Sequence, residues 1–334
     1  MKQIIISFAI TVILVSGCIS TTRTNSVVST PQPTTNSGTM TTSSLSCNNY
    51  QTQANQARQD LVKLGELFTT LKKRNCSADD LEQLERNMSN LAATKASNLV
   101  QSGNLDEAEN WLKYKYTPVN LWITQSVRGD IAAQRKQWQE AALFYNQALD
   151  LMADPKATPE QPPHSEIQKV YNLAIEAQLL AENMVVATTK SYGSPSSGTM
   201  RDNIGSFKIT KRPIPIKFNP GKSTLTSAGK NSAKQMAAYL KRKEPQHVTL
   251  VGHTDPKGTD KANCRLSIKR ASSLKNYLVN DLGVNFEIET IGKGERELYM
   301  SYGVSRYSKK EIDKLNRRVE FFTDPSYVSR DKEC

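Results

Sequence analysis

Two charged residues in the C-terminal half of the chain, Asp255 and Arg270, could together hold a zwitterion. Asp255 follows a short apolar run, and Arg270 lies 15 residues further on, in a stretch with helical spacing. A carboxylate accepts hydrogen bonds from an ammonium group, and a guanidinium binds a carboxylate through two parallel hydrogen bonds, which lysine cannot do. The pair therefore predicts a site for a ligand with an ammonium and a carboxylate on one carbon. The alternative is a purely structural salt bridge.

The three histidines do not form a catalytic set with other residues. One lies in a proline-rich loop, His247 begins a predicted strand, and His253 ends it two residues before Asp255. His253 and Asp255 could act as a base and its orienting group, but no nucleophilic serine or cysteine motif and no set of metal ligands accompanies them. Gly292-x-Gly294 alone is too short for a nucleotide-binding loop. The sequence favours a binding protein over an enzyme, with no metal or other cofactor.

The N-terminus has the pattern of an export signal that ends in a lipid-modified cysteine. Met1 and Lys2 precede an apolar run, and Leu14 to Cys18 read LVSGC. About a dozen apolar residues are fewer than the roughly 20 that span a bilayer as a helix. The string resembles the bacterial lipoprotein box, which implies a signal peptide over residues 1–17 and acylation, as by palmitate, of Cys18. An ordinary secretory signal with a chance cysteine is the alternative.

The residues after Cys18 predict where the protein is held. Aspartate at position 19 is the familiar inner-membrane retention signal of lipoproteins, so Ile19 favours the outer membrane. Residues 18–46 form a predicted disordered tether, because the 28 residues from Ile19 to Ser46 include seven Ser, nine Thr and two Pro. Such a segment buries too little apolar surface to offset the entropy of ordering. As a random coil it reaches about 30 Å.

Positive charge is confined to the C-terminal half. Residues 1–207 carry 18 Lys+Arg and 18 Asp+Glu, whereas residues 208–334 carry 26 and 14, which accounts for the net charge of +12. This asymmetry indicates an anionic partner, with a merely solvated basic surface as the alternative. Nucleic acid is not the expected partner of an exported lipoprotein.

Residues 47–190 have the spacing of helices. Leucines recur at three- and four-residue steps from Leu61 to Leu71, and Ser77 precedes two acidic residues as a helix cap would. Residues 103–109 (GNLDEAE) match the turn and second helix of a tetratricopeptide unit, and Ala141 lies 33 residues after Ala108. The match covers one good unit and one partial unit. The interpretations are therefore a tetratricopeptide-like domain or an unrelated helical bundle.

Prolines at 155–163 interrupt this region before a last helix from about Ser165 to Thr188, and residues 191–207 form a predicted linker. Strands and helices then alternate through residues 208–334. Strands are expected at 214–218, 247–252, 286–291 and 319–323, with a helix capped by Thr226 and a second around 266–278 that Gly283 ends. Alternation of this kind predicts an α/β sandwich with helices packed on one sheet. The chain as a whole is thus predicted to be an α+β protein.

The motif around the charged pair resembles a known family. Gly252 to Ala271 reads GHTDPKGTDKANCRLSIKRA, and Gly292 to Glu295 and Asn316 to Glu320 follow in order (GKGE and NRRVE). Over about residues 210–323 the chain resembles the OmpA-like peptidoglycan-binding domain. The resemblance implies that Asp255 and Arg270 hold the meso-diaminopimelate of the peptidoglycan stem peptide. The same resemblance implies further residues that contact the ligand or line its pocket: Asn263, Thr254, Leu266, Asn219 and Arg317.

The chain departs from the family pattern in the same region. Ala262 stands where the family usually has tyrosine, which removes an aromatic wall. Asn219 stands where many members have aspartate, and Pro220 stiffens that loop. Asn263 is expected to cap the second helix. The segment from Glu297 to Leu315 is long and tyrosine-rich, so its alignment with the family is unreliable.

Four cysteines remain after lipidation: Cys47, Cys76, Cys264 and Cys334. An even number in an oxidising compartment indicates disulfides, and three connectivities are formally open. Pairing within each half gives Cys47–Cys76 and Cys264–Cys334. Metal binding is the poorer interpretation, because no Cys-x-x-Cys spacing occurs.

These predictions describe a lipid-anchored outer-membrane protein that faces the periplasm and binds diaminopimelate-type peptidoglycan through residues 208–334. The alternative is a scaffold whose helical half recruits another envelope protein, such as a secretion, stator or efflux component, while wall binding positions it. Grooves between helices suit partner helices.

Overall fold

The computed structural model describes residues 47, 49–113, 115–183, 198–302 and 307–334. The predicted signal peptide, Cys18, the tether and part of the predicted linker lie outside the described residues. No helix among the described residues is long and apolar enough to cross a membrane. The described residues from Cys47 onward belong to one compact unit.

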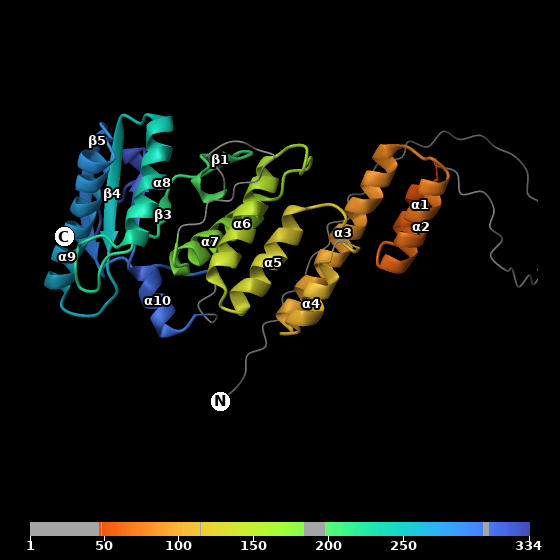
Figure 1. Ribbon diagram of the computed structural model, residues 1–334, viewed down its shortest axis with the longest axis horizontal. Coiled ribbons are helices and arrows are strands. Elements are labelled where there is room, and N and C mark those ends of the chain that lie inside the picture. Colours follow the sequence, from red (N-terminus) through yellow and green to blue (C-terminus); the bar gives the residue numbers. More distant parts are fainter. Residues whose placement is uncertain (1–46, 48, 114, 184–197, 303–306) are drawn as a thin grey trace, which may run out of the picture. The chain divides into compact units, whose positions relative to one another are not determined.

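The first part of this unit is entirely helical, as the sequence predicts (Figure 1). Its helices are α1 (Tyr50–Gln56), α2 (Leu61–Lys73), α3 (Ala78–Gln101), α4 (Leu105–Trp111), α5 (Trp122–Gln134), α6 (Trp138–Ala153) and α7 (His164–Leu180). Neighbours along the chain pack on one another, and α3 also contacts α5. The tetratricopeptide interpretation stays a prediction.

Local sequence explains where two of these helices begin. The Asp60 carboxylate accepts hydrogen bonds from the backbone N–H groups of Val62 (3.1 Å) and Lys63 (3.2 Å) at the start of α2. The Ser77 hydroxyl accepts one from Asp80 N (3.1 Å) at the start of α3. These side chains satisfy N–H groups that have no partner inside the helix. The predicted Ser77 cap is confirmed.

Gly129 allows α5 and α6 to approach closely. A Cβ atom at this position would lie 2.6 Å from ring carbons of Tyr145, which no real contact tolerates. Tyr145 is 1% exposed and donates a hydrogen bond from its hydroxyl to Asp130 (2.8 Å). The small residues Ala141 and Ala148 of α6 are fully buried in the same core. The small residues on either side of Tyr145 in the sequence, Ala141 and Ala148, thus allow close helix packing.

The hydrophobic core around α6 and α7 continues into the second half of the chain. It includes Ile204, Ile209 and Leu315 together with the buried faces of α5, α6 and α7. Part of the predicted linker is ordered here: η1 (Gly198–Met200), β1 (Asn203–Ile204) and β2 (Phe207–Lys208) follow one another. Gly198 N donates to the buried Asp150 carboxylate (2.8 Å), so this segment is fastened to α6.

The second half is built on a four-stranded sheet of order β3-β6-β4-β5. Its strands are β3 (Arg212–Ile214), β4 (His247–His253), β5 (Glu287–Gly294) and β6 (Val319–Phe322), and only β4 and β5 run parallel. Helices α8 (Ser227–Lys243) and α9 (Asp260–Asn276) bury their apolar residues against Val248, Leu250 and Phe321 in one core. The expected α/β sandwich and the α+β class are confirmed.

Several element boundaries differ from the sequence-based expectations. The first strand of the sheet ends at Ile214, and Phe218 forms only an isolated bridge with Leu225. The helix α9 continues into a π-helical segment, η2 (Tyr277–Asp281), before Gly283 adopts φ +62°. The helix α10 (Lys309–Asn316) was not expected from the sequence. The start of α8 is as expected, because the Thr226 hydroxyl accepts a hydrogen bond from Gly229 N.

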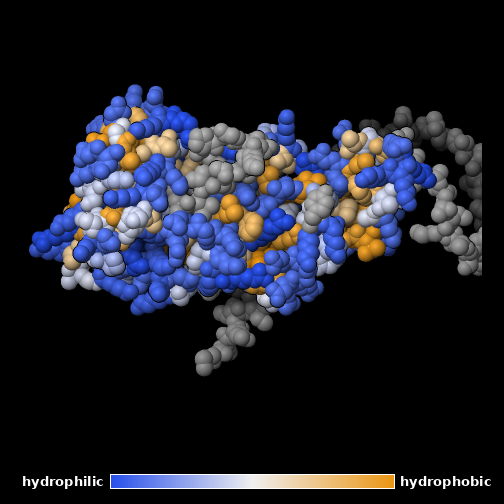
Figure 2. Space-filling view, in the orientation of Figure 1, coloured by the Kyte–Doolittle hydropathy of each residue, from blue (hydrophilic) through white to orange (hydrophobic). Residues whose placement is uncertain are grey.

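Most of the face that Figure 2 shows is hydrophilic. On the face drawn in Figure 2, hydrophobic residues form small patches among charged and polar ones. Among the described residues, Met300 (91%) and Val62 (70%) are the most exposed large hydrophobic side chains.

Candidate functional site

A pocket of about 640 Å³ contains most of the predicted site residues. We call it the clamp pocket. It is lined by five segments of the chain: Leu180, Ala181 and Glu182 at the end of α7; Ile216, Lys217, Phe218, Pro220 and Gly221 after β3; Thr254, Asp255 and Lys257 after β4; Asn263, Leu266 and Arg270 on α9; and Lys314 and Arg317 at the end of α10.

Helix α9 presents Arg270 to the pocket because it lies close against the sheet. Thr259 caps α9, accepting a hydrogen bond from Ala262 N (3.3 Å). A Cβ atom on Gly252 of β4 would lie 2.3 Å from the backbone oxygen of Ser267 on α9. The glycine of the GHTD motif therefore has a packing role, since any side chain there would push α9 away from the strand.

Arg270 is buried but has no carboxylate partner. Arg270 is 5% exposed, and its Nε donates a hydrogen bond to the Lys222 carbonyl (3.2 Å). The guanidinium carbon lies 5.2 Å from the centre of the Phe218 ring, a cation–π contact. No acidic side chain of the described residues forms an ion pair with it. Burial lowers the pKa of Arg270, Arg317 lowers it further, and Asp255 opposes them.

The Asp255 carboxylate is held by two groups. Its Oδ1 accepts a hydrogen bond from Lys257 N (3.1 Å), and its Oδ2 forms an ion pair with Arg317. The residue is 8% exposed. The direct partner of Asp255 is thus Arg317, so the structural salt bridge considered from the sequence exists with a different arginine. Asp255 and Arg270 line the same pocket without bonding to each other.

All but one of the other predicted site residues line the clamp pocket. Thr254, Asn263 and Leu266 line the pocket, whereas Asn219 does not. The side chain of Asn219 donates instead to the Thr224 hydroxyl (3.1 Å) within its own loop. Among the described residues, the buried hydroxyl of Thr254 has no hydrogen-bond partner, so a ligand could use it.

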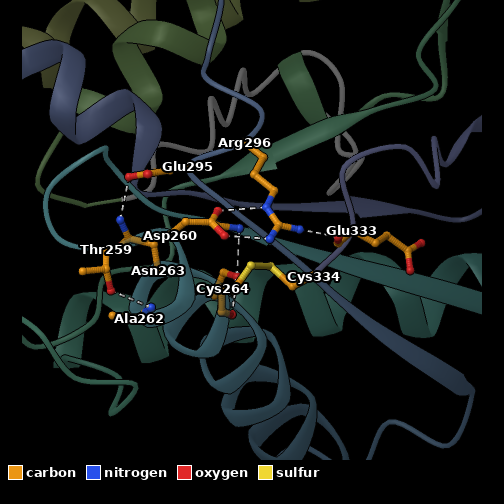
Figure 3. Close-up of a disulfide and its surroundings, with 11 residues drawn as sticks. Thr259, Asp260, Ala262, Asn263, Cys264, Glu295, Arg296, Glu333 and Cys334 are labelled. Carbon is orange, nitrogen blue, oxygen red and sulfur yellow. Dashed lines mark hydrogen bonds and ion pairs between the residues drawn. A yellow bond between two sulfur atoms is a disulfide. The ribbon is translucent and has the colours of Figure 1, made fainter.

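The expectation that Asn263 caps α9 is wrong. Thr259 is the cap, and Asn263 lies one turn further on, 4% exposed. Its side-chain amide donates to the Glu295 carboxylate (2.7 Å), as Figure 3 shows. The helix begins earlier than expected because Thr259 and Asp260 provide the cap and the first-turn acid.

A disulfide fixes the C-terminus beside the start of α9 (Figure 3). Cys264 is bonded to Cys334, and Cys47 to Cys76, so of the three connectivities left open by the sequence the structure has the one with pairing within each half. Cys334 N also donates to the Gly292 carbonyl (2.9 Å). Asp260 pairs with Arg296 at 2.7 Å. These contacts hold the first turn of α9, and with it Asn263, on the end of β5.

His253 does not take part in the pocket. It is 1% exposed and lies 3.5 Å from the Glu320 carboxylate. Burial lowers the pKa of His253, although Glu320 acts in the opposite direction. His253 is therefore not oriented by Asp255, and the two do not form a base with its orienting group. The described residues contain no group of three His, Cys, Asp or Glu that could hold a metal ion.

Sequence reasoning missed the end of α7 and the three lysines that line the pocket, Lys217, Lys257 and Lys314. Lys217 donates a hydrogen bond from Nζ to the Leu179 carbonyl in the last turn of α7 (2.7 Å). Burial, followed by the nearby charges of Lys314 and Arg317, lowers the pKa of Lys217 to about 8, while Glu182 acts against them. The one signal in the sequence is a lysine between the apolar residues Ile216 and Phe218.

Comparison with known proteins agrees with this architecture. Residues 217–310 match the family model described as OmpA family. The chain therefore carries an OmpA family domain at its C-terminus, and the resemblance seen in the sequence is confirmed.

Individual relatives match about a quarter to a third of the chain. Outer membrane porin F of Pseudomonas aeruginosa is 32% identical over 114 residues, 34% of this chain and 31% of that protein. The probable lipoprotein YiaD of Escherichia coli is 32% identical over 124 residues, 37% of this chain and 52% of that protein. The structure of the peptidoglycan-associated lipoprotein from Burkholderia pseudomallei aligns with a TM-score of 0.28 at 24% identity, covering 34% of this chain and 88% of that one. The chain thus spans about a third to a half of the curated relatives it matches.

Proposed function

We propose that this protein binds peptidoglycan non-covalently in the clamp pocket, with Asp255 and Arg270 holding the diaminopimelate of a stem peptide. The observation that carries the proposal is Arg270, a buried guanidinium that lines the pocket and has no acidic partner among the described residues. A buried charge without a counter-ion is costly, so a ligand carboxylate that pairs with it gains energy that water cannot supply.

Asp255 can accept the ligand ammonium without losing Arg317. A carboxylate offers about four lone-pair sites, and the two hydrogen bonds from Lys257 N and Arg317 occupy two of them. Arg317 thereby holds the carboxylate in place before the ligand arrives, which lowers the entropic cost of binding. Thr254 and Asn263 supply further polar contacts, and Leu266 supplies an apolar one.

We place the protein in the outer membrane, held by a lipid on Cys18 and facing the periplasm. The lipoprotein-box resemblance supports this placement, as do relatives that are named outer-membrane proteins or a probable lipoprotein. Several acyl chains on one residue give a stable anchor, whereas a single chain is marginal. The protein would then connect the outer membrane, or a complex held there, to the cell wall.

Sedimentation with purified sacculi tests wall binding. A purely electrostatic adhesive predicts that Asp255→Ala, which makes the protein more positive, binds equally or more tightly. The clamp predicts that Asp255→Ala and Arg270→Ala each weaken binding about 10- to 100-fold, the value of one charge-assisted hydrogen bond. Both losses should persist in 0.15 M salt, where screening limits long-range attraction to about 8 Å. Wild-type binding by Asp255→Ala under these conditions would reject the clamp.

A second candidate function is recruitment of an envelope protein by the helical half. A groove of about 680 Å³ between α4, α5 and α6 favours it. The groove contains Arg128, whose guanidinium donates to the Leu112 carbonyl (2.7 Å), and Arg135, which pairs with Asp106 and Glu109. Arg128→Glu in the full chain should abolish crosslinking to such a partner and leave sacculus binding intact. Loss of sacculus binding instead would contradict separate roles for the two halves.

A further inference from the structure

The charges of the clamp pocket do not balance. Its lining includes five basic side chains and only two acidic ones, Asp255 and Glu182. Arg317 pairs with Asp255, and Lys257 pairs with Asp313 at 2.6 Å. Lys217, Lys314 and Arg270 remain without an ion pair to any acidic side chain of the described residues. A zwitterion held by Asp255 and Arg270 uses one of these three cations and leaves the two lysines.

Lys217 is positioned for a second anion. It is half-buried, and its Nζ has one hydrogen bond, to a neutral carbonyl of α7. An ammonium group has three donors, so two remain for a ligand. Lys314 and Arg317 line the same pocket, and after burial their charges lower the pKa of Lys217, whereas the Glu182 carboxylate raises it. An anion placed among them would relieve their mutual repulsion.

We propose that Lys217 and Lys314 form a second subsite in the clamp pocket that binds a further carboxylate of the ligand. The inference rests on the proposed peptidoglycan function and extends it from one amino acid to an acidic peptide. Arg317 pairs with Asp255, lines the same pocket as Arg270 and Lys217, and lowers the pKa of both, so both subsites are near it. The ligand therefore carries its second carboxylate close to the zwitterion, within one or two residues.

Stem peptides offer a matched pair of probes for this subsite. In a γ-linked glutamyl-diaminopimelate peptide, the α-carboxylate of the glutamate is free, and in its isoglutamine counterpart the same position is a neutral amide. Both peptides contain the zwitterion. Isothermal titration of the full mature chain with each peptide therefore measures the second carboxylate alone.

We expect the wild-type protein to bind the acid peptide about 10-fold more tightly than the amide peptide, as one charge-assisted hydrogen bond in a half-exposed site gives. Lys217→Met should remove this preference, so that the acid and amide peptides bind with nearly equal affinity. Lys314→Met should reduce the preference for the acid peptide. It tests the subsite independently if Lys217→Met does not fold. Lys241→Met is the control, because it removes the same charge from the last turn of α8, outside the pocket.

The outcomes separate the subsite from the clamp. Equal binding of both peptides by the wild-type protein would overturn the subsite and leave the clamp standing. A preference that survives in both folded lysine variants would also overturn it. Failure of the wild-type protein to bind either peptide would instead reject the proposed function on which the subsite rests.

Discussion

At the residue scale, Arg317 and Lys217 alter the site that Asp255 and Arg270 form. Arg317 pairs with Asp255, and Lys217 adds a positive charge to the same pocket. The sequence could predict Asp255 and Arg270 because their types match a zwitterion and their motif matches a family. It could not predict that Asp255 pairs with Arg317, which is 62 residues away along the chain. It also could not predict the environment of Lys217, because the last turn of α7 supplies its hydrogen-bond partner. Pairings between distant segments follow from packing, which local spacing does not encode.

The pKa of Lys217 makes binding of the acid peptide pH-dependent. With a pKa of about 8 in the free protein, the Lys217 ammonium is present at pH 7 and mostly lost at pH 9. A bound carboxylate favours the protonated lysine, so binding takes up protons and weakens as pH rises. In the free protein, burial lowers this pKa most, Lys314 and Arg317 lower it further, and Glu182 raises it.

We expect the affinity for the acid peptide to fall about fivefold between pH 7 and pH 9, as linkage predicts for a 10-fold preference. The amide peptide should show almost no such change, and neither should Lys217→Met with the acid peptide. Titration calorimetry at both pH values measures this. An equal loss for both peptides would assign the pH dependence to another group.

At the element scale, packing glycines and caps determine how the helices lie. The sequence predicted the helical region, the Ser77 and Thr226 caps and strand β4, because spacing and capping are local signals. It misplaced the start of α9, since both Thr259 and Asn263 are good caps and tertiary contacts decide between them. It missed α10, whose Ser308 and Glu311 form a capping box.

Gly129 gives a direct test of helix packing. In Gly129→Ala the new methyl group would overlap the Tyr145 ring, so α5 and α6 must separate. We expect a loss of about 1–3 kcal/mol in the free energy of unfolding, typical of overpacking.

Gly65→Ala is the matched control for this substitution. Gly65 lies within α2, and a Cβ atom there would meet only Met88 Cε at 3.9 Å. This variant should be more stable by about 0.5–1 kcal/mol, because alanine is the better helix former. Urea unfolding monitored by circular dichroism measures both changes, and a Gly129→Ala protein as stable as Gly65→Ala would contradict the described packing.

At the scale of the whole molecule, the two halves share a core. The carboxylate of Glu176 on α7, fully buried, accepts hydrogen bonds from Tyr302 N (2.5 Å) and the Tyr307 hydroxyl (2.6 Å). Composition suggested two separate domains joined by a linker over 191–207, whereas the core around α6 and α7 includes Leu315 from α10. The charge distribution and the hydrophobic spacing of the sequence distinguish the two halves. They do not show which surface of one half packs against the other.

The proposed anchor is tested on the same scale. Cys18→Ala removes the sulfur that would carry the lipid, so we expect the protein to leave the membrane fraction or to accumulate as the unprocessed precursor. Fractionation of the envelope with immunodetection measures this, and wall binding by the purified variant should be unchanged. A Cys18→Ala protein that is still cleaved after residue 17 and still found in the outer membrane would contradict the anchor.

The clamp itself is tested most directly by changing the ligand and Arg270 together. A stem peptide with lysine in place of meso-diaminopimelate keeps the ammonium and lacks only the carboxylate that Arg270 is proposed to bind. The wild-type chain should bind the diaminopimelate peptide about 10- to 100-fold more tightly than the lysine peptide. Arg270→Ala should abolish this preference. Arg270→Lys, which keeps the charge, should also lose most of it because lysine has no planar fork.

This double comparison, made by titration calorimetry on variants whose melting temperature matches the wild type, isolates one contact from all others in the pocket. The account predicts that the two peptides become equivalent only when Arg270 is replaced. Equal affinity of the wild-type chain for both peptides, or an undiminished preference in Arg270→Ala, would contradict it.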